Sequence, residues 1–420
     1  MCPSKPAQPT KVDDHLEEDE SDCTREGFVW GLVMLLTGTF CTIFTKAQFG
    51  IRATGTEVCV IDGVASTLCY FDKPWFGVVQ MKFGMAGCLA VVWIQQALRK
   101  KKHKGTKDRL MVVDDEHDAS WHTITWVLVP AALDLLCTIL ANVGLLWISS
   151  SIQQMTKGSL VLFNALVLVQ CMGKRLFAYQ YVSIAVVVLA ITLVAYVGLV
   201  HSGSTSTTTD QADQANIILG FVCILLSQFV TAWQIVTEEW LLTEHQLSPA
   251  VLVGWEGLWG LLFFVVLGPV LMLTPAGDSG MAKIWHEDFT DTFVKLRHSS
   301  SLVGTIFLYC ICTGVYNFSA NCVTKHLSSV MCSILDTMRA LGIWIVALAL
   351  YYVVGQTGAT SAGEQWTAWS WLELTGFVLL VVGTLMYKKV IRVPVHALYE
   401  AEEREHAHLH EKTPLMVATV

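Results

Sequence analysis

Residues 250–273 read AVLVGWEGLWGLLFFVVLGPVLML, a run of 24 residues with one charged side chain, Glu256. At about 1.5 Å per residue, roughly 20 apolar residues in a helix cross the hydrocarbon core of a bilayer. Similar stretches occur at 27–46, 74–97, 123–147, 151–172, 178–200, 216–241, 301–323, 328–353 and 368–388. The sequence therefore predicts an all-α polytopic membrane protein with ten transmembrane helices.

The composition agrees with a membrane protein and excludes several other classes. Of the 420 residues, 53% are hydrophobic and 15% are charged, whereas soluble domains carry about 25% charged residues. The net charge of -8 gives no sign of nucleic-acid binding. The chain has no phosphate-binding loop, no H-E-x-x-H or G-x-S-x-G motif, and no His/Cys cluster with metal-ligand spacing. We expect no enzymatic activity, no cofactor and no metal.

The distribution of Lys and Arg predicts the topology. If the N-terminus is cytosolic, the cytosolic segments hold 18 basic residues and the opposite side holds five. Basic residues concentrate on the cytosolic side of membrane proteins. We therefore expect a cytosolic acidic tail over 1–26, a luminal loop over 201–216 and a second cytosolic tail over 389–420.

Charged residues within the apolar stretches are costly and indicate function. Asp134, Glu256, Asp336 and Arg339 lie too deep to reach water along the side chain, so each needs a partner or a watery cavity. Asp336 and Arg339 are three residues apart and share a helix face. A role in a transport pathway and a static internal ion pair both remain open.

Other charges have simpler explanations in the sequence. Lys82 lies seven residues into its stretch, and we expect its long side chain to reach the membrane surface. Glu238 and Glu239 close the stretch 216–241, where we expect solvent to reach them.

An internal similarity predicts a repeat. The motif Gln154-Met155-Thr156-Lys157 resembles Asp336-Thr337-Met338-Arg339, 182 residues later, and each follows a Ser-rich turn. Two halves of five helices each, 27–200 and 217–388, have opposite orientations in a membrane. Such inverted five-helix repeats are typical of secondary transporters, which bind solute near the midplane between the halves.

Several short motifs carry a resemblance to a known family. They are Leu36-Thr37-Gly38, Pro130-Ala131-Ala132-Leu133-Asp134, Gln154-Met155-x-Lys157-Gly158, Gln234-x-Val236-x-Glu238-Glu239, Glu256-Gly257-Leu258-x-Gly260, Tyr316-Asn317-Phe318 and Asp336-x-x-Arg339. With these motifs the chain resembles the drug/metabolite transporter superfamily over about 28–388, and within it subfamily F of solute carrier family 35. Nucleotide-sugar carriers and transporters of the chloroquine-resistance type are more distant relatives. The chain has Lys157 where we expect Arg, and Met85 near where relatives carry an acidic residue.

The resemblance implies a solute carrier that works by alternating access on a nucleotide sugar or another small polar or charged metabolite. The residues that it implies for solute binding are Lys46, Gln154, Lys157, Asn317, Asp336 and Arg339. Asp134 and Glu256 are the candidates for proton coupling. Two alternatives remain: a carrier of amino acids, peptides or cationic drugs, and a non-transporting membrane adaptor that keeps the transporter fold.

Two further features concern the loops and the C-terminal tail. Cys59 and Cys69 share the first non-cytosolic loop, where a disulfide and two free thiols are both open alternatives. Glu411, Leu415 and Met416 resemble an acidic dileucine sorting signal, which clathrin adaptors bind. Together with the family resemblance, this signal predicts an endolysosomal membrane. A homodimer is also left open.

Overall fold

The computed structural model describes residues 12–61, 64–71, 73–103, 121–144, 156–172, 177–203, 211–275, 285–354, 366 and 370–387. The first half of the chain contains α1 (Val12–Gly50), β1 (Arg52–Ile61), β2 (Val64–Tyr70), α2 (Pro74–His103), α3 (Trp121–Trp126), α4 (Leu128–Gly144), α6 (Ser159–Met172) and α7 (Ala178–Gly203). The second half contains α8 (Gln211–Thr243), α9 (Pro249–Leu273), α11 (Phe289–His298), α12 (Ser300–His326), α13 (Ser329–Val354) and α14 (Ser370–Tyr387).

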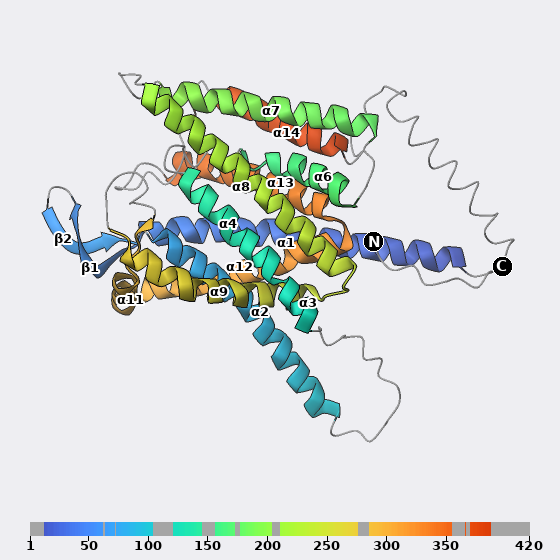
Figure 1. Cartoon of the computed structure of the whole chain (residues 1–420), viewed down its shortest axis with the longest axis horizontal. Helices are drawn as coiled ribbons and strands as arrows, with labels where there is room; N and C mark the ends of the chain where they lie inside the picture. Colours follow the sequence, from blue (N-terminus) through green and yellow to red (C-terminus); the bar gives the residue numbers. More distant parts are fainter. Residues whose placement is uncertain are drawn as a thin grey trace.

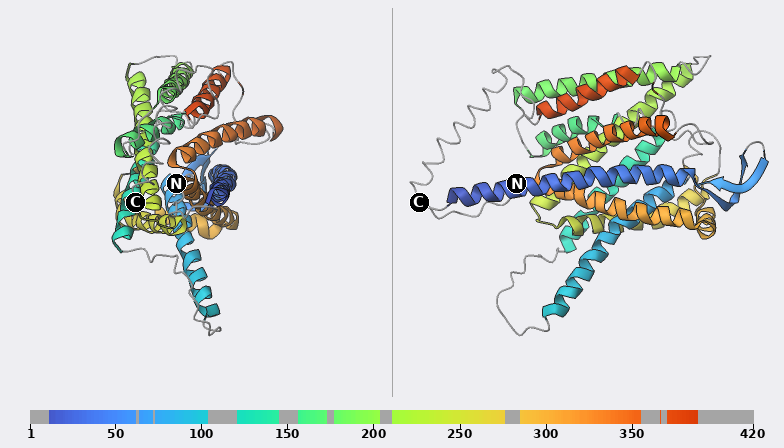
Figure 2. Two further views of the ribbon diagram at one scale, coloured as in Figure 1. Left: turned by 90° about the vertical axis from the view of Figure 1, so that its right-hand side faces the viewer. Right: turned by 180° about the vertical axis from the view of Figure 1, so that it is seen from behind.

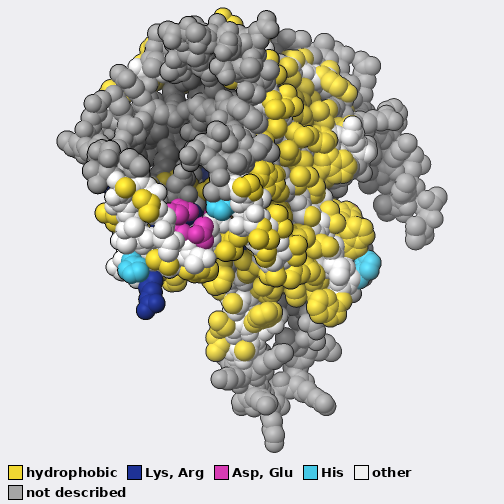
Figure 3. Space-filling view, turned by 60° about the vertical axis from the view of Figure 1, so that its left-hand side comes forward, with side chains coloured by type: hydrophobic (Ala, Val, Ile, Leu, Met, Phe, Trp, Pro, Cys, Tyr) yellow, Lys and Arg dark blue, Asp and Glu magenta, His cyan; other side chains and the backbone are white. Residues whose placement is uncertain are grey.

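Long helices run roughly side by side through the molecule (Figures 1 and 2). In the described part of the chain, seven helical segments are long and apolar enough to cross a membrane: Arg25–Gly50, Pro74–Leu98, Trp121–Gly144, Ile217–Thr243, Pro249–Leu273, Ser300–His326 and Ser370–Tyr387. This finding confirms a polytopic helical membrane protein. Large apolar side chains such as Phe83, Val266 and Phe307 are exposed. Figure 3 shows a broad hydrophobic area on one face of the bundle, which suits contact with lipid.

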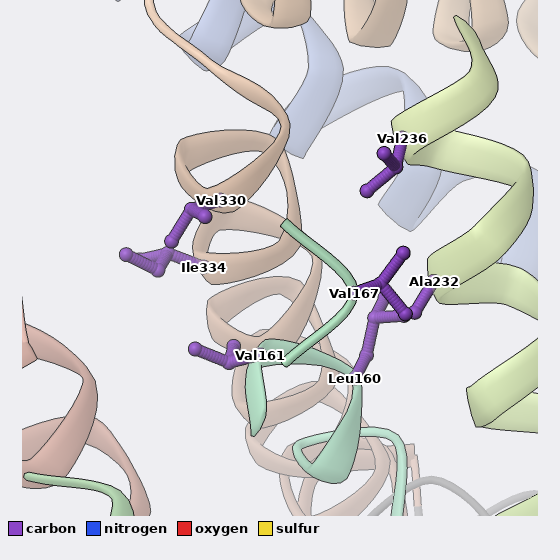
Figure 4. Packing of buried hydrophobic residues seen from close by; sticks show 7 residues of the cluster. All are labelled: Leu160, Val161, Val167, Ala232, Val236, Val330 and Ile334. Atoms are coloured by element: carbon purple, nitrogen blue, oxygen red, sulfur yellow. The ribbon is translucent and has the colours of Figure 1, made fainter. Parts of the chain in front are cut away.

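Most long helices pack mainly against a helix from the other half of the chain. The pairs are α1 with α12, α2 with α9, α4 with α8, and α7 with α14; the last pair lies along one edge in Figures 1 and 2. Near the centre, α6, α8 and α13 meet in an apolar cluster of Leu160, Val161, Val167, Ala232, Val236, Val330 and Ile334 (Figure 4). This interleaving brings side chains distant in sequence to the middle of the bundle.

Local signals explain several helix ends. Pro249 occupies the first turn of α9, where its missing N–H costs no hydrogen bond. The Asp288 side chain caps α11 by accepting hydrogen bonds from the amides of Thr290 and Asp291. α7 ends at Gly203 and α8 begins at Gln211, so both helices extend into the segment 201–216 that we expected to form a loop.

Two elements outside the long helices were not expected from the sequence. β1 and β2 form an antiparallel hairpin after α1, and the short helix α11 precedes α12. Both lie at the same end of the bundle, opposite α3 (Figure 1).

Candidate functional site

A lysine from α2 lies inside the bundle between two acidic side chains. Lys82 is fully buried, and its ammonium forms an ion pair with the Asp134 carboxylate on α4. Glu256 Oε1, on α9, lies 3.7 Å from Lys82 Nζ. Lys82 does not reach the membrane surface, so the prediction from its position was wrong. A buried ammonium needs a compensating charge, and Lys82 obtains it from the two carboxyl groups predicted for proton coupling.

Glycines on α9 make room for this lysine. A Cβ atom added at Gly260 would lie 2.5 Å from Lys82 Cδ, and one at Gly257 would lie 2.7 Å from the Lys82 carbonyl oxygen. At Gly254 an added Cβ would meet Leu89 Cβ at 2.6 Å. Small residues let transmembrane helices approach closely. The glycine face of α9 therefore lets α2 and α9 pack closely, with the Lys82 side chain against the glycines.

Two residues of α8 extend the charged group. Gln234 Nε2 donates a hydrogen bond to Glu238 Oε1 at 2.9 Å and another to Glu256 Oε1 at 3.2 Å. Glu238 is 7% exposed, so the prediction that solvent reaches it was wrong. We call Lys82, Asp134, Gln234, Glu238 and Glu256 the acidic cluster. It holds three carboxyl groups and one ammonium, and this excess of negative charge favours binding of a proton or another cation.

A second group, which we call the arginine cluster, consists of Gly38, Tyr316, Asp336 and Arg339. The Arg339 guanidinium forms an ion pair with Asp336 Oδ1 at 2.6 Å, and Tyr316 donates to the same oxygen at 2.7 Å. Arg339 also lies over the Tyr316 ring, 4.9 Å from its centroid, and donates to the Gly38 carbonyl at 3.4 Å. The shared helix face predicted this ion pair as one of its two alternatives.

Lys157 and Cys137 connect the two clusters electrostatically. Lys157, just before α6, lies within electrostatic reach of Asp336 and Arg339. Cys137, one turn after Asp134, lies within reach of both Lys82 and Lys157. Charged groups on α2, α4 and α13, together with Lys157, therefore lie within electrostatic reach of one another or of Cys137.

The remaining predicted residues are placed as follows. Asn317 Nδ2 donates to the Thr313 carbonyl of its own helix at 2.9 Å. Cys59 and Cys69 are joined by a disulfide, with their Cα atoms 5.9 Å apart. The side chain of Lys46, and all of Gln154, Glu411, Leu415 and Met416, lie outside the part of the chain that the structure describes.

A buried polar seam beside the clusters was not predicted. Asn164 on α6 donates to Ser333 Oγ at 2.7 Å, and the Glu239 carboxylate accepts from the Ser329 amide at 3.3 Å. Glu239 is 7% exposed, so it is not solvated as we expected from the sequence. Its carboxylate instead holds the start of α13 against α8, because a negative charge is favourable near a helix N-terminus.

No family model matches the chain. An uncharacterized protein of Schizosaccharomyces pombe is 32% identical over 267 residues, which cover 64% of this chain and 75% of that protein. Solute carrier family 35 member F6 of Homo sapiens is 28% identical over 366 residues, 87% of this chain and 89% of the human protein. The chain belongs to subfamily F of solute carrier family 35. The Mus musculus member F6 is 27% identical over the same shares of both chains.

Membership of this solute carrier family makes the two clusters the candidate site of the bundle. The human and mouse relatives named above match 87% of this chain, so the similarity extends over most of the bundle. Lys82, Gln234 and Glu238 are the members of the acidic cluster that the sequence did not single out as a site. A basic residue amid two acidic ones on separate helices was the available signal, but only the packing reveals the ion pair.

Proposed function

We propose that the chain is a secondary-active transporter that works by alternating access, with the solute bound between the acidic cluster and the arginine cluster. The ion pair of Lys82 with Asp134 and Glu256 is the observation that carries this proposal. Charges inside a membrane bundle are costly and mark substrate or proton pathways. A protein that acted only as an adaptor would need no such group at its centre.

The helix pairing supports an architecture of ten transmembrane helices in two inverted repeats. If α1, α2, α4, α6 and α7 correspond to α8, α9, α12, α13 and α14, the pair α1–α12 corresponds to α8–α4. The pairs α2–α9 and α7–α14 correspond to themselves. The offset of 182 residues relates Lys157 to Arg339 and also Asp134 to Tyr316. A pairing pattern that is unchanged on exchange of the halves is what a two-fold axis between repeats produces.

The charges favour a solute with an anionic group. Lys157 and Arg339 together exceed the single carboxylate of Asp336 in their part of the centre. A nucleotide sugar or another small polar, negatively charged metabolite fits this excess. Lys46 and Asn317 stay in the proposed binding set, because they belong to α1 and α12, which carry members of the arginine cluster. Gln154 stays in it because it precedes Lys157 by three residues in the sequence.

The acidic cluster supports proton coupling through Asp134 and Glu256. Lys82 can neutralise one carboxylate, and the other two lie in a nearly dry part of the bundle. Gln234 donates to Glu238 and Glu256 together. A proton that binds to Asp134 or Glu256 in one state of the carrier and leaves in the other would link solute movement to a proton gradient.

Purified protein in liposomes tests the proposal. Uptake and counterflow are measured for nucleotide sugars, amino acids, short peptides and cationic drugs, with and without a pH gradient and against empty liposomes. We expect counterflow of at least one solute class, and we expect Glu256→Gln to lose the stimulation of uptake by a pH gradient. A monodisperse protein that moves none of these solutes would favour the adaptor alternative.

We also propose an endolysosomal membrane with both termini cytosolic, and recognition of Glu411, Leu415 and Met416 by a clathrin adaptor. A self-associated homodimer remains a prediction of the same kind. The test of the address is the double variant Leu415→Ala with Met416→Ala on a tagged copy. Surface labelling should increase, and an unchanged distribution would exclude the tail as the sorting signal.

A further inference from the structure

At one end of the bundle, segments from the two halves of the chain meet around four charged side chains (Figure 1). Lys73, just before α2, has its Nζ atom 2.7 Å from Glu57 Oε1 on β1 and 3.2 Å from Asp291 Oδ2 on α11. Lys295 Nζ lies 2.8 Å from Asp291 Oδ2 and 3.7 Å from Glu57 Oε2. We call Glu57, Lys73, Asp291 and Lys295 the latch.

Three of the four latch residues are buried, and the group as a whole is electrically neutral. Asp291 and Lys295 are at most 1% exposed, and Lys73 is 5% exposed. Two ammonium groups face two carboxylates, so the group needs no further ion to balance its charge. The contacts Lys73–Asp291 and Lys295–Glu57 both join the first half of the chain to the second.

An irregularity in the hairpin provides the other half of this contact. β1 pairs Thr54 with Leu68 and Cys59 with Ser66, so residues 55–58 oppose only Thr67 of β2. Such a bulge frees backbone groups from the strand ladder. The freed amides of Thr56 and Glu57 donate to Asp291 Oδ1 at 2.6 and 3.0 Å.

Two further features adapt the bulge to this contact. Gly55 permits the close approach, because a Cβ atom there would lie 2.8 Å from Lys295 Cε and would collide with the Asp291 carboxylate. The disulfide between Cys59 and Cys69 joins the strands next to the bulge and restrains its shape.

Other contacts between the two halves lie directly beneath the latch. The Glu287 carboxylate, from the segment before α11, accepts hydrogen bonds from the amides of Trp75 and Phe76 at 2.7 Å each and so caps α2. Ala53, Phe71 and Leu302 form a buried apolar layer. These layers seal the hairpin end of the bundle above the two clusters.

We propose that the latch is a gate: the hairpin and α11 hold this end of the carrier shut, and the two ion pairs that join the halves, Lys73–Asp291 and Lys295–Glu57, break when the solute site opens toward the hairpin side. This inference rests on the proposed function, because only a carrier with alternating access has to open there. In the closed form the bulge amides donate hydrogen bonds to Asp291, and in the open form these hydrogen bonds are lost.

Ion pairs suit a contact that must form and break repeatedly. The cost of removing charges from water nearly cancels their attraction in a buried pair, so the closed and hydrated forms differ little in free energy. An apolar contact at the same place would lose its burial free energy on opening, because hydration of apolar surface brings no compensating gain. Loss of one member, by contrast, leaves an unpaired buried charge and should favour the open, hydrated form.

Thiol labelling tests the gate without any solute. Cys310 on α12 contacts the Gln80 carbonyl of α2 at 3.3 Å, below the latch. A membrane-impermeant maleimide is added from the hairpin side of oriented vesicles, and modification of Cys310 is followed by peptide mass spectrometry. We expect labelling to be at least tenfold faster in Lys73→Met, Asp291→Asn and Lys295→Met than in the unmodified chain.

Arg297→Met is the matched control, because Arg297 is a basic residue on the same short helix but is exposed. Glu57→Gln is a milder latch variant at a half-exposed position, and it should increase labelling at least threefold even if the buried variants fold poorly. Equal labelling rates in Glu57→Gln, Arg297→Met and the unmodified chain would overturn the gate. Uptake measurements are independent of this result, so the gate and the carrier function can fail separately.

Discussion

Lys82 and Asp134 form an ion pair between α2 and α4 inside a bundle whose outer surface is apolar. Neither residue lies near the other in the sequence, and Lys82 itself shows no exposed surface. The pair connects the helix that packs against the α9 glycines with the helix that packs against α8. It therefore couples the two interfaces on which the acidic cluster is built.

We expect Lys82→Met to lower the melting temperature, because it leaves Asp134 and Glu256 without their counter-charge. In the double variant Lys82→Met with Asp134→Asn, much of the loss should be recovered, with an interaction energy of about 2 kcal/mol in the mutant cycle. Thermal unfolding of detergent-purified protein measures it. Additive losses in the two single variants would show that the ion pair has no coupling energy.

We expect Glu256→Gln to remove the dependence of uptake on a pH gradient while solute exchange continues, because the amide cannot carry the proton. The measurement is proteoliposome uptake over a range of imposed gradients, beside counterflow at equal pH. Glu244→Gln is the control, since Glu244 is an exposed acidic residue just after α8. Unchanged pH dependence in both Glu256→Gln and Asp134→Asn would refute proton coupling at this cluster.

Arg339→Ala should abolish uptake. It should also destabilise the protein, because the variant removes the counter-charge of the partly buried Asp336 carboxylate. The double variant Asp336→Asn with Arg339→Ala separates these effects: we expect its melting temperature to recover and its uptake to stay absent. If the double variant transports normally, Arg339 serves only the ion pair and has no role in solute binding.

Gly257→Ala should separate α2 from α9, because the added Cβ collides with the backbone of Ala86 and Lys82. Overpacking of this kind costs about 1–3 kcal/mol. Gly87→Ala is the control on α2, since an added Cβ there has no heavy atom within 4 Å. Equal melting temperatures for the two variants would contradict the close packing that we describe.

The latch should be insensitive to the pH of an acidic organelle. Burial alone would raise the pKa of Asp291, but hydrogen bonds from Lys295 and two backbone amides, together with the Lys73 charge, hold this pKa well below its usual value. Burial alone would lower the pKa of Lys73, but its hydrogen bond to Glu57 and the charges of Glu57 and Asp291 raise this pKa above its usual value.

The signs define the pH window. Because the pKa of Asp291 is lower in the folded protein than in the unfolded chain, its ionised carboxylate stabilises the fold fully above the unfolded value of about 3.9. This stabilisation is lost as the pH falls further. The raised pKa of Lys73 contributes stability below about 10.4, which is lost as the pH rises through the folded value. Hydrogen exchange of residues 51–61, corrected for intrinsic rates, should therefore show constant protection from about pH 5 to 8. Loss of protection near pH 5 would contradict this assignment.

The sequence predicted the seven membrane-spanning helices found in the described residues, because runs such as 250–273 have few alternatives in a bilayer. It also offered the Asp336–Arg339 pair, whose spacing of three residues is a local property. It failed for Lys82, Glu238 and Glu239, where burial depends on helices far away in the chain. The hairpin and α11 were missed because short polar elements carry little periodic signal, and their stability comes from mutual contacts such as Thr56 with Asp291.

The pairing of α1 with α12, and of α7 with α14, has a consequence for biosynthesis. α1 finds its main partner, α12, only after about 270 further residues have been made. Until then, its polar and glycine positions face lipid or an insertion factor instead of protein. Neither half can be a folding unit of its own, so a chain that stops before α12 should be degraded, whereas two halves synthesised together should assemble.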